Sequence, residues 1–329
     1  MNAPNAAGVY LEAYLEPLRP WLARADVTDI LVNAPEEVWI ESIHGGMERH
    51  AAPGLTATAL ARLAAQIAAL THQGVNRENP LLAATLPDGA RVQIVAPPAT
   101  RRDLALAIRK HVVNDFSLDD YARAGAFAET RRGDSARSLD ADRSMAALLE
   151  ANDVMAFLRA AVRHRKNIIV SGGTSTGKTT FLNALLKAIP REERLIVIED
   201  TPEVRIEQPN AVGMVAARGV LGEARVGVED LLQASLRLRP DRIILGELRG
   251  PEAFSFLRAV NSGHPGSITT VHADNPDSAM NQIALMVLQS GANMSRSEII
   301  DYVTGVVQVA VQLGRRDGKR TVTDIVFRP

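Results

Sequence analysis

The residues with the clearest chemical role form the run GGTSTGKT at 172–179, which closely follows the apolar run NIIV. Gly172 and Gly177 allow backbone N–H groups to turn toward phosphate oxygens, and a helix beginning near Lys178 would point its positive end at them. With this spacing Lys178 reaches the outer phosphates of a nucleotide and Thr179 can ligate Mg²⁺. The run therefore predicts a phosphate-binding P-loop. The alternative is a glycine-rich turn before an ordinary helix.

A candidate base lies in RPDRIILGELRG at 239–250, where Glu247 comes just after an apolar run. In P-loop folds the carboxyl ends of the strands face the bound phosphates, so we expect Glu247 to lie beside them. A glutamate there can polarise the attacking water while Lys178 and Mg²⁺ offset charge on the phosphoryl group. The alternative is a solvated acidic residue at the end of a strand.

A second group of carboxylates follows the apolar run of LIVIEDTPEV, which contains Glu199, Asp200 and Glu203. Carboxylate oxygens are hard ligands, so these side chains could bind Mg²⁺ or its water molecules. Acidic residues after strands also cap turns, and the residues alone leave that alternative open.

Two of the seven histidines fall in the short run GHPGSITTVHA, at His264 and His272. An imidazole can donate a hydrogen bond to an anionic oxygen, so either histidine could sense the terminal phosphate of a nucleotide. The spacing does not choose between them, and a structural role is an equal alternative.

The elements that must position these residues fall into two predicted domains, which together give an α/β fold. Apolar strands separated by helical segments after residue 145 predict a mainly parallel sheet covered on both faces, and Asp317-Gly318 predicts a terminal hairpin. A helical pattern runs from Met145 to His164. The expected strands of this domain are NIIV (167–170), LIVIED (195–200) and RIILGE (242–247).

The first part of the chain predicts a smaller α+β domain. One amphipathic helix is expected from Thr56 to Thr71. The expected strands are VTDILVN (27–33), EVWIE (37–41), RVQIVA (91–96) and LALAIRK (104–110). We therefore predict an N-terminal α+β domain over 1–127, a polar linker over 128–144 and a P-loop ATPase domain over 145–329.

The overall composition narrows the class of function. A net charge of −1 and 4% aromatic residues disfavour a nucleic-acid track, which combines basic grooves with stacking platforms. The absence of cysteine excludes disulfides and thiolate metal sites and fits a reducing compartment. The N-terminus lacks the pattern of a signal peptide, and no apolar run is long enough to span a bilayer. We therefore expect a cytoplasmic protein.

Taken in order, GGTSTGKTT, VIEDTPE, LRPDRIILGELRG and NSGHPGSITTVHA resemble the Walker A, Asp, Walker B and His boxes of the secretion ATPase superfamily. Within it, NPLLAATLPDGARVQIVAPPA, LLQASLRLRPDRIILGELRG and GPEAFSFLRAVNSGHPG are most similar to the traffic ATPases of type IV secretion, the eleventh component of the VirB system. The resemblance runs from about Val27 to Val311 and is least clear over the linker.

This resemblance implies a RecA-like C-terminal domain, a homo-hexameric ring and a nucleotide held between the two domains. It suggests that Arg109 faces the phosphates from the N-terminal domain, although Arg101, Arg102 and Lys110 lie nearby. The catalytic residues it implies are Glu247, Lys178, Glu203, His272 and Arg109. The phosphate-binding residues are Gly172, Gly173, Thr174, Ser175, Thr176, Gly177, Lys178, Thr179 and Thr180. The expected Mg²⁺ ligands, direct or through water, are Thr179, Glu199 and Asp200.

The function that the resemblance implies is coupling of Mg-ATP hydrolysis and interdomain closure to a bacterial type IV secretion or conjugation apparatus. The expected partners are inner-membrane components of that apparatus, with peripheral membrane contact and no direct nucleic-acid binding. The alternatives are a pilus assembly or retraction ATPase of the same superfamily, a RecA-like DNA motor, and a small-molecule kinase. A zero cysteine count excludes the tetracysteine zinc module common among type II secretion relatives.

Overall fold

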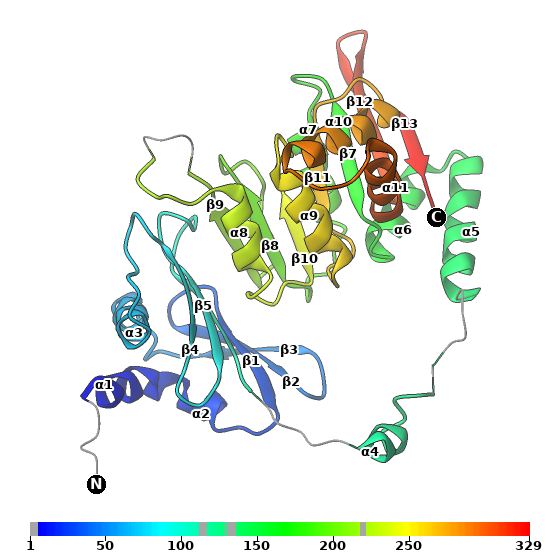
Figure 1. Ribbon diagram of the computed structural model, residues 1–329. Coiled ribbons are helices and arrows are strands. Elements are labelled where there is room, and N and C mark those ends of the chain that lie inside the picture. The colour runs from blue at the N-terminus through cyan, green and yellow to red at the C-terminus, as the bar shows by residue number, and fades with distance from the viewer. Residues whose placement is uncertain (1–5, 112–116, 129, 131–135, 218–221) are drawn as a thin grey trace.

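The computed structural model describes residues 6–111, 117–128, 130, 136–217 and 222–329, and these form an α/β fold in two domains (Figure 1). The predicted fold class is confirmed. The N-terminal domain contains an antiparallel sheet with helices, and the C-terminal domain a larger, mostly parallel sheet.

The N-terminal sheet has six strands in the order β3-β2-β1-β6-β5-β4, all paired antiparallel where registers are given. The four expected strands and the expected helix are present, whereas α1, β3 and β4 were not predicted. The elements are α1 (Ala6–Leu15), the 3-10 helix η1 (Glu16–Leu18), α2 (Arg19–Leu22), β1 (Val27–Val32), β2 (Glu37–Ser42), β3 (Met47–Ala51), α3 (Ala57–Leu70), β4 (Leu81–Thr85), β5 (Arg91–Val95) and β6 (Ala105–Arg109).

The two faces of this sheet have different tasks because side chains alternate along each strand. On one face, Ile30, Ile94 and Ile108 pack in a core with the apolar stripe of α3. On the other face, Leu31 and Ala107 belong to the apolar cluster of the C-terminal domain. One face of the sheet thus forms the core of the N-terminal domain, and the other face packs against the C-terminal domain.

The C-terminal sheet has seven strands in the order β13-β12-β7-β11-β10-β8-β9, and every pair is parallel except β12 with β13. The expected hairpin is present, with Asp317 and Gly318 at positive φ in its turn. Its first strand also pairs with β7, so the hairpin extends the main sheet. The strands are β7 (Ile168–Gly172), β8 (Leu195–Glu199), β9 (Ala211–Val215), β10 (Arg242–Leu245), β11 (Ile268–Val271), β12 (Val309–Arg316) and β13 (Lys319–Phe327).

Helices cover this sheet and connect its strands. The helix expected from Met145 to His164 is two helices, and the first already begins at Ala136, inside the segment expected to be a linker. Residues 129 and 131–135 of that segment lie outside the described part. The helices after β6 are α4 (Leu118–Arg123), α5 (Ala136–Glu150), α6 (Val154–Arg163), α7 (Lys178–Leu186), α8 (Val228–Ser235), α9 (Glu252–Asn261), α10 (Pro276–Gln289) and α11 (Arg296–Val306).

The two domains are joined by packing and by polar contacts. Figure 1 shows the N-terminal domain beside β8, β9 and α8, with α5 on the other side of the C-terminal sheet. The fully buried Arg194 donates to Asn33 at 2.8 Å across the domain boundary. Arg239 donates to Glu41 from Nε at 2.6 Å. These contacts fix which strands of the N-terminal domain face the C-terminal sheet.

Candidate active site

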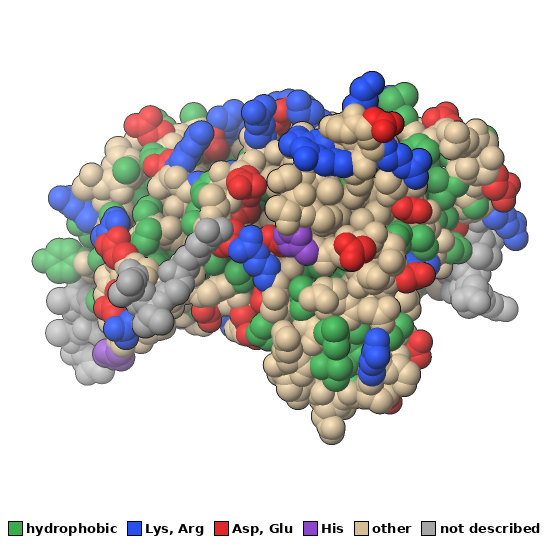
Figure 2. Space-filling model, turned by 90° about the horizontal axis from the view of Figure 1, so that it is seen from above, with side chains coloured by type: hydrophobic (Ala, Val, Ile, Leu, Met, Phe, Trp, Pro, Cys, Tyr) green, Lys and Arg blue, Asp and Glu red, His purple; other side chains and the backbone are tan. Residues whose placement is uncertain are grey.

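A cavity of about 430 Å³ at the carboxyl ends of the parallel strands brings together the four sequence motifs. Its wall includes Lys178 and Thr179 of the glycine-rich run, Asp200 of the acidic run, Glu247 and His272. Figure 2 views the molecule from above and shows acidic, basic and histidine side chains gathered on this face. The four motifs can lie together because the strands that they follow, β7, β11, β10 and β8, are neighbours in the sheet.

The glycine-rich run forms a tight loop between β7 and α7. Gly177 is the N-cap of α7 with φ of 95°, a left-handed conformation that favours glycine. A Cβ on Gly172 would lie 2.6 Å from Thr176 Oγ1 and 2.8 Å from the Leu313 carbonyl, so that position also requires glycine. The loop therefore places the N-terminus of α7, with its exposed N–H groups, against the cavity, as an anion site requires.

Lys178 lies over this loop. Its Nζ donates to the carbonyls of Gly172 at 3.0 Å and Gly173 at 3.1 Å, and lies 3.2 Å from Nδ1 of His272. Burial lowers the pKa of the Lys178 ammonium, and the nearby Arg249 lowers it further against the opposing effect of Glu247. The ammonium is thus held at the cavity wall, and no carboxylate among the described residues forms an ion pair with it.

His272 connects Lys178 with Glu247. Because an ammonium can only donate, the imidazole Nδ1 facing Lys178 must accept, which places the ring proton on Nε2. That Nε2 lies 2.8 Å from Glu247 Oε1. His264 lies elsewhere, with Nδ1 2.9 Å from the Ala259 carbonyl at the end of α9. The structure therefore brings His272, and not His264, to the cavity.

The other oxygen of Glu247 is held by Arg249, a residue that the sequence reasoning missed. Arg249 Nε donates to Glu247 Oε2 at 2.7 Å, and its Nη1 donates to Asp200 Oδ2 at 2.9 Å. The hydrogen bond to Glu247 is the main cause of a raised Arg249 pKa. Its place in LGELRG, two residues after the proposed base, was the available signal.

Glu199 differs from the other acidic residues because both of its oxygens are already occupied. Oε1 accepts from the backbone N–H groups of Glu203 at 3.0 Å and Val204 at 2.8 Å, while Oε2 accepts from Arg101 of the N-terminal domain. The Glu199 side chain is only 3% exposed. It supports the loop that carries Asp200 and Glu203.

Comparison with known proteins identifies the family. A family model described as "Type II/IV secretion system protein" matches residues 134–323. The type IV secretion system protein VirB11 of Bartonella quintana is 39% identical over 328 residues, which cover 96% of this chain and 92% of that protein. The chain belongs to the type II/IV secretion ATPase family. It is a homologue of VirB11, and the ATP-hydrolysing activity expected from its motifs is that of its family.

Two further relatives agree with this identification. The type IV secretion system protein PtlH of Bordetella pertussis is 38% identical over 97% of this chain and 95% of its own length. The crystal structure of the VirB11 ATPase from the Brucella suis type IV secretion system, in complex with sulphate, superimposes with a TM-score of 0.90. It is 36% identical, with 98% of this chain and 95% of that chain covered.

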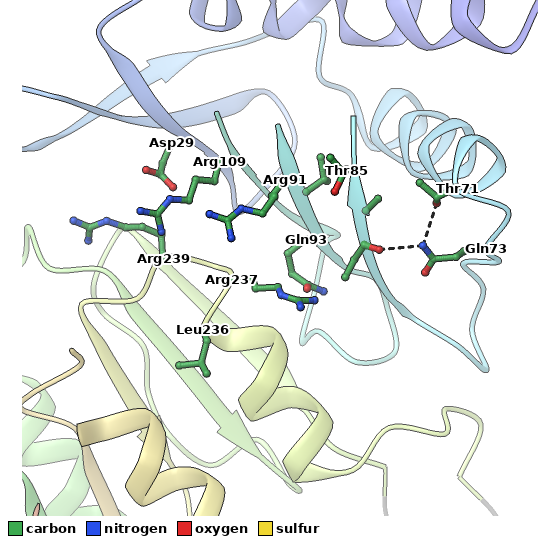
Figure 3. Close-up of a pocket in the computed structure, with 13 residues that line it drawn as sticks. Asp29, Thr71, Gln73, Thr85, Arg91, Gln93, Arg109, Leu236, Arg237 and Arg239 are labelled. Atoms are coloured by element: carbon green, nitrogen blue, oxygen red, sulfur yellow. Dashed lines mark hydrogen bonds between the residues drawn. The ribbon is translucent and has the colours of Figure 1, made fainter. Parts of the chain in front are cut away.

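Arg109, which the resemblance places at the phosphates, lies away from the P-loop cavity in this arrangement of the domains. Arg109 lies in a different cavity, beside Asp29 and Arg91 (Figure 3), and does not line the cavity that contains Lys178. Arg101, which the sequence left as an alternative, instead reaches Glu199 and also donates to the Val204 carbonyl at 2.8 Å. The reason is geometric: Arg109 ends β6 on the part of the sheet facing Arg237 and Arg239, whereas Arg101 follows β5 beside β9.

A second missed residue, Arg320, enters the cavity from the terminal hairpin. A Cβ built on Gly177 would lie 2.9 Å from Arg320 Cδ, so this arginine lies directly over the start of α7. The pairing of β12 with β7 brings the hairpin to the P-loop, and local sequence patterns do not predict this contact.

The arrangement also bears on metal binding. Among the residues that the structure describes, no group of three or more His, Cys, Asp or Glu side chains could hold a metal ion. Mg²⁺ commonly uses one or two protein oxygens together with substrate phosphates and water, and Thr179 and Asp200 line the cavity in that way. These two residues fit the ion, whereas the occupied oxygens of Glu199 do not favour direct ligation. None of the described helices is both long and apolar enough to cross a membrane.

Proposed function

We propose that this family member forms a homo-hexameric ring that couples Mg-ATP hydrolysis and interdomain closure to a type IV secretion or conjugation apparatus. It acts on the cytoplasmic side of the inner membrane, with peripheral contact to that membrane and to inner-membrane components of the apparatus. The proposal is supported by the naming of its relatives as type IV secretion system proteins and by a cavity that combines a P-loop with Glu247 and His272.

The observation that carries the hydrolytic part is the continuous contact from Lys178 through His272 to Glu247. Lys178 and the N–H groups of α7 bind the outer phosphates, and Glu247 accepts the proton of the attacking water. His272 changes partner as the terminal phosphate enters, because its Nδ1 and Nε2 are both within contact distance of groups that ATP would displace. Loss of the phosphate restores the original contacts.

Arg249 holds Glu247 and Asp200 in the substrate-free protein. A phosphate oxygen entering the cavity competes for this guanidinium, since charge-assisted hydrogen bonds to phosphate are strong and frequently bidentate. Glu247 is then released to act on water. Mg²⁺, held by Thr179 and Asp200, supplies charge neutralisation at the phosphates when bound.

Coupling between hydrolysis and domain movement rests on the contact of Arg101 with Glu199. Arg101 belongs to the N-terminal domain, and Glu199 orders the backbone at Glu203 and Val204 beside the cavity. Substrate can shift the domain arrangement only by its different affinity for the two arrangements, and this contact supplies a route for that difference.

Particle mass measured by native mass spectrometry, with and without Mg-ATP, tests the ring, and release of phosphate measured in parallel tests hydrolysis. The expected result is a species six times the chain mass together with steady production of ADP and phosphate. A monomer under all conditions would refute the ring. Turnover that depends on added DNA would instead favour the nucleic-acid motor.

A further inference from the structure

The terminal hairpin of β12 and β13 carries one basic side chain into the P-loop cavity. β12 pairs with β7 as far as Leu313 opposite Gly172, where β7 ends, and the hairpin continues beyond that point. Arg320 lies in this projecting part of the hairpin, opposite Arg315 of β12. Among the described residues of β12 and β13, Arg320 alone lines the cavity.

The Arg320 side chain lies directly across the start of α7. A Cβ built on Gly177 would lie 2.9 Å from Arg320 Cδ, 3.4 Å from its Nε and 3.5 Å from its Nη1. Gly177 is the N-cap of α7, so the guanidinium lies beside the first turn of that helix. The N–H groups of a first turn have no partner within the helix and can bind an anion. An anion bound there lies within reach of Arg320.

Arg320 differs from the other cations of the cavity wall in having no partner. Arg249 is held by Glu247 and Asp200. Lys178 donates to two carbonyls of the P-loop. The Arg320 guanidinium is exposed, and no hydrogen bond or ion pair joins it to any residue that the structure describes. It is therefore free to bind a ligand without first breaking a contact.

The strand order determines which part of a nucleotide lies beside Arg320. Glu247 and His272 follow β10 and β11, which are on one side of β7, whereas the hairpin is on the other side. Hydrolysis requires the terminal phosphate to lie beside Glu247, so the rest of the nucleotide extends over the P-loop and away from that residue. The α-phosphate and the nucleoside then lie on the side of Arg320.

We propose that Arg320 is a nucleotide-binding residue that donates hydrogen bonds to the α-phosphate of ATP and ADP. This inference rests on the proposed binding of ATP in the P-loop cavity and assigns a further residue to that site. A guanidinium presents several N–H donors in a fixed plane, and its hydrogen bonds to phosphate are charge-assisted. Lys178 binds the outer phosphates, so Arg320 contributes to nucleotide affinity without contacting the reacting γ-phosphate.

Isothermal titration calorimetry with Mg-ADP on the full chain tests the contact. Arg320→Gln is expected to weaken binding about tenfold, because it removes a charged donor to phosphate. Arg320→Lys keeps the positive charge and is expected to recover part of this loss. Arg320→Lys protein that binds as weakly as Arg320→Gln contradicts a charge contact with the α-phosphate.

Arg316→Gln is the matched control, because Arg316 is an exposed arginine of the same hairpin that does not line the cavity. It changes the net charge by the same amount and is expected to leave Mg-ADP affinity unchanged. Equal Mg-ADP affinity in the Arg320→Gln and Arg316→Gln proteins overturns the proposal.

Steady-state ATPase gives a second readout that a merely structural role would not produce. In Arg320→Gln, kcat/KM is expected to fall about tenfold, with most of the change in KM, because the lost contact is not made to the γ-phosphate. A fall confined to kcat overturns the proposal. Wild-type protein that binds Mg-ADP but releases no phosphate from ATP refutes the proposed hydrolysis, and the Mg-ADP comparison still decides the role of Arg320.

Discussion

Replacement of Arg101 by alanine is expected to separate the role of this arginine from that of its neighbours. Arg101 is in the N-terminal domain, yet its guanidinium donates to Glu199 and to the Val204 carbonyl in the C-terminal domain. The change removes both contacts and leaves a carboxylate that is 3% exposed with only its backbone N–H partners. We therefore expect loss of both stability and turnover.

The magnitude follows from the burial of the two partners. Breaking a buried ion pair by removing one partner costs about 3–5 kcal/mol, because the other charge stays buried and unpaired. The Arg101 side chain is 18% exposed and Glu199 keeps two backbone hydrogen bonds, so the expected loss lies at or below the lower limit of this range, at about 2–3 kcal/mol. With a urea slope of about 3 kcal/mol per molar, the unfolding midpoint falls by roughly 1 M.

Equilibrium unfolding in urea, followed by tryptophan fluorescence, measures this loss. Both tryptophans, Trp21 and Trp39, are in the N-terminal domain, and Trp39 belongs to the apolar cluster that joins the domains. Arg102→Ala is the matched control, because Arg102 is the exposed neighbouring arginine and its removal is expected to change stability by less than about 0.5 kcal/mol.

A double variant tests the pair itself. Glu199→Gln in the Arg101→Ala background removes the unpaired charge, so it is expected to recover at least about 1 kcal/mol. Steady-state ATPase measured on the same proteins should fall in Arg101→Ala and stay at wild-type level in Arg102→Ala. Equal stability and equal turnover in these two single variants would refute the assignment of Arg101 as the interdomain contact to the acidic loop.

Four predictions concern the P-loop cavity. Lys178→Ala is expected to abolish productive ATP binding, because it removes the ammonium that attracts the outer phosphates. Only the charged form of Lys178 does so, and the ATP affinity of the wild-type protein should therefore fall as pH rises toward the pKa of Lys178, which burial holds below its usual 10.5. Equilibrium binding measured across pH tests both expectations, and a wild-type affinity that stays constant up to pH 10.5 contradicts the second. Glu247→Gln should bind Mg-ATP normally and hydrolyse it about 100-fold more slowly in single-turnover assays. His272→Phe keeps a ring without nitrogens, so turnover should fall roughly tenfold; an unchanged rate removes His272 from the mechanism.

Much of the fold could be predicted because its signals are local. The P-loop glycines, the apolar strands and the Asp317-Gly318 turn each depend on backbone preferences or side-chain periodicity within a few residues. The elements that were missed have weaker patterns. For example, β3 has no buried residue, and α5 begins among polar and charged residues that local reasoning assigned to a linker.

The part of the candidate site that lies at the ends of the parallel strands could be predicted from the sequence. The part that depends on how the two domains pack against each other could not. Lys178, Glu247 and His272 meet because parallel strands end at one edge of a sheet, a consequence of the alternating pattern. Residue spacing alone does not separate His272 from His264, because both histidines lie in the same short run; the family resemblance favours His272, and the structure places that residue in the cavity.

The amino-acid sequence alone is enough to predict a P-loop domain, a smaller α+β domain and a resemblance to the secretion ATPases, because these depend on residue types at short, ordered spacings. The positions of three arginines become known only from the packed structure: Arg101 reaches the acidic loop, Arg109 faces a second cavity, and Arg320 lies over α7. Long arginine side chains reach whatever element is packed against their own. Their partners therefore follow from domain docking and strand order, which neighbouring residues in the chain do not encode.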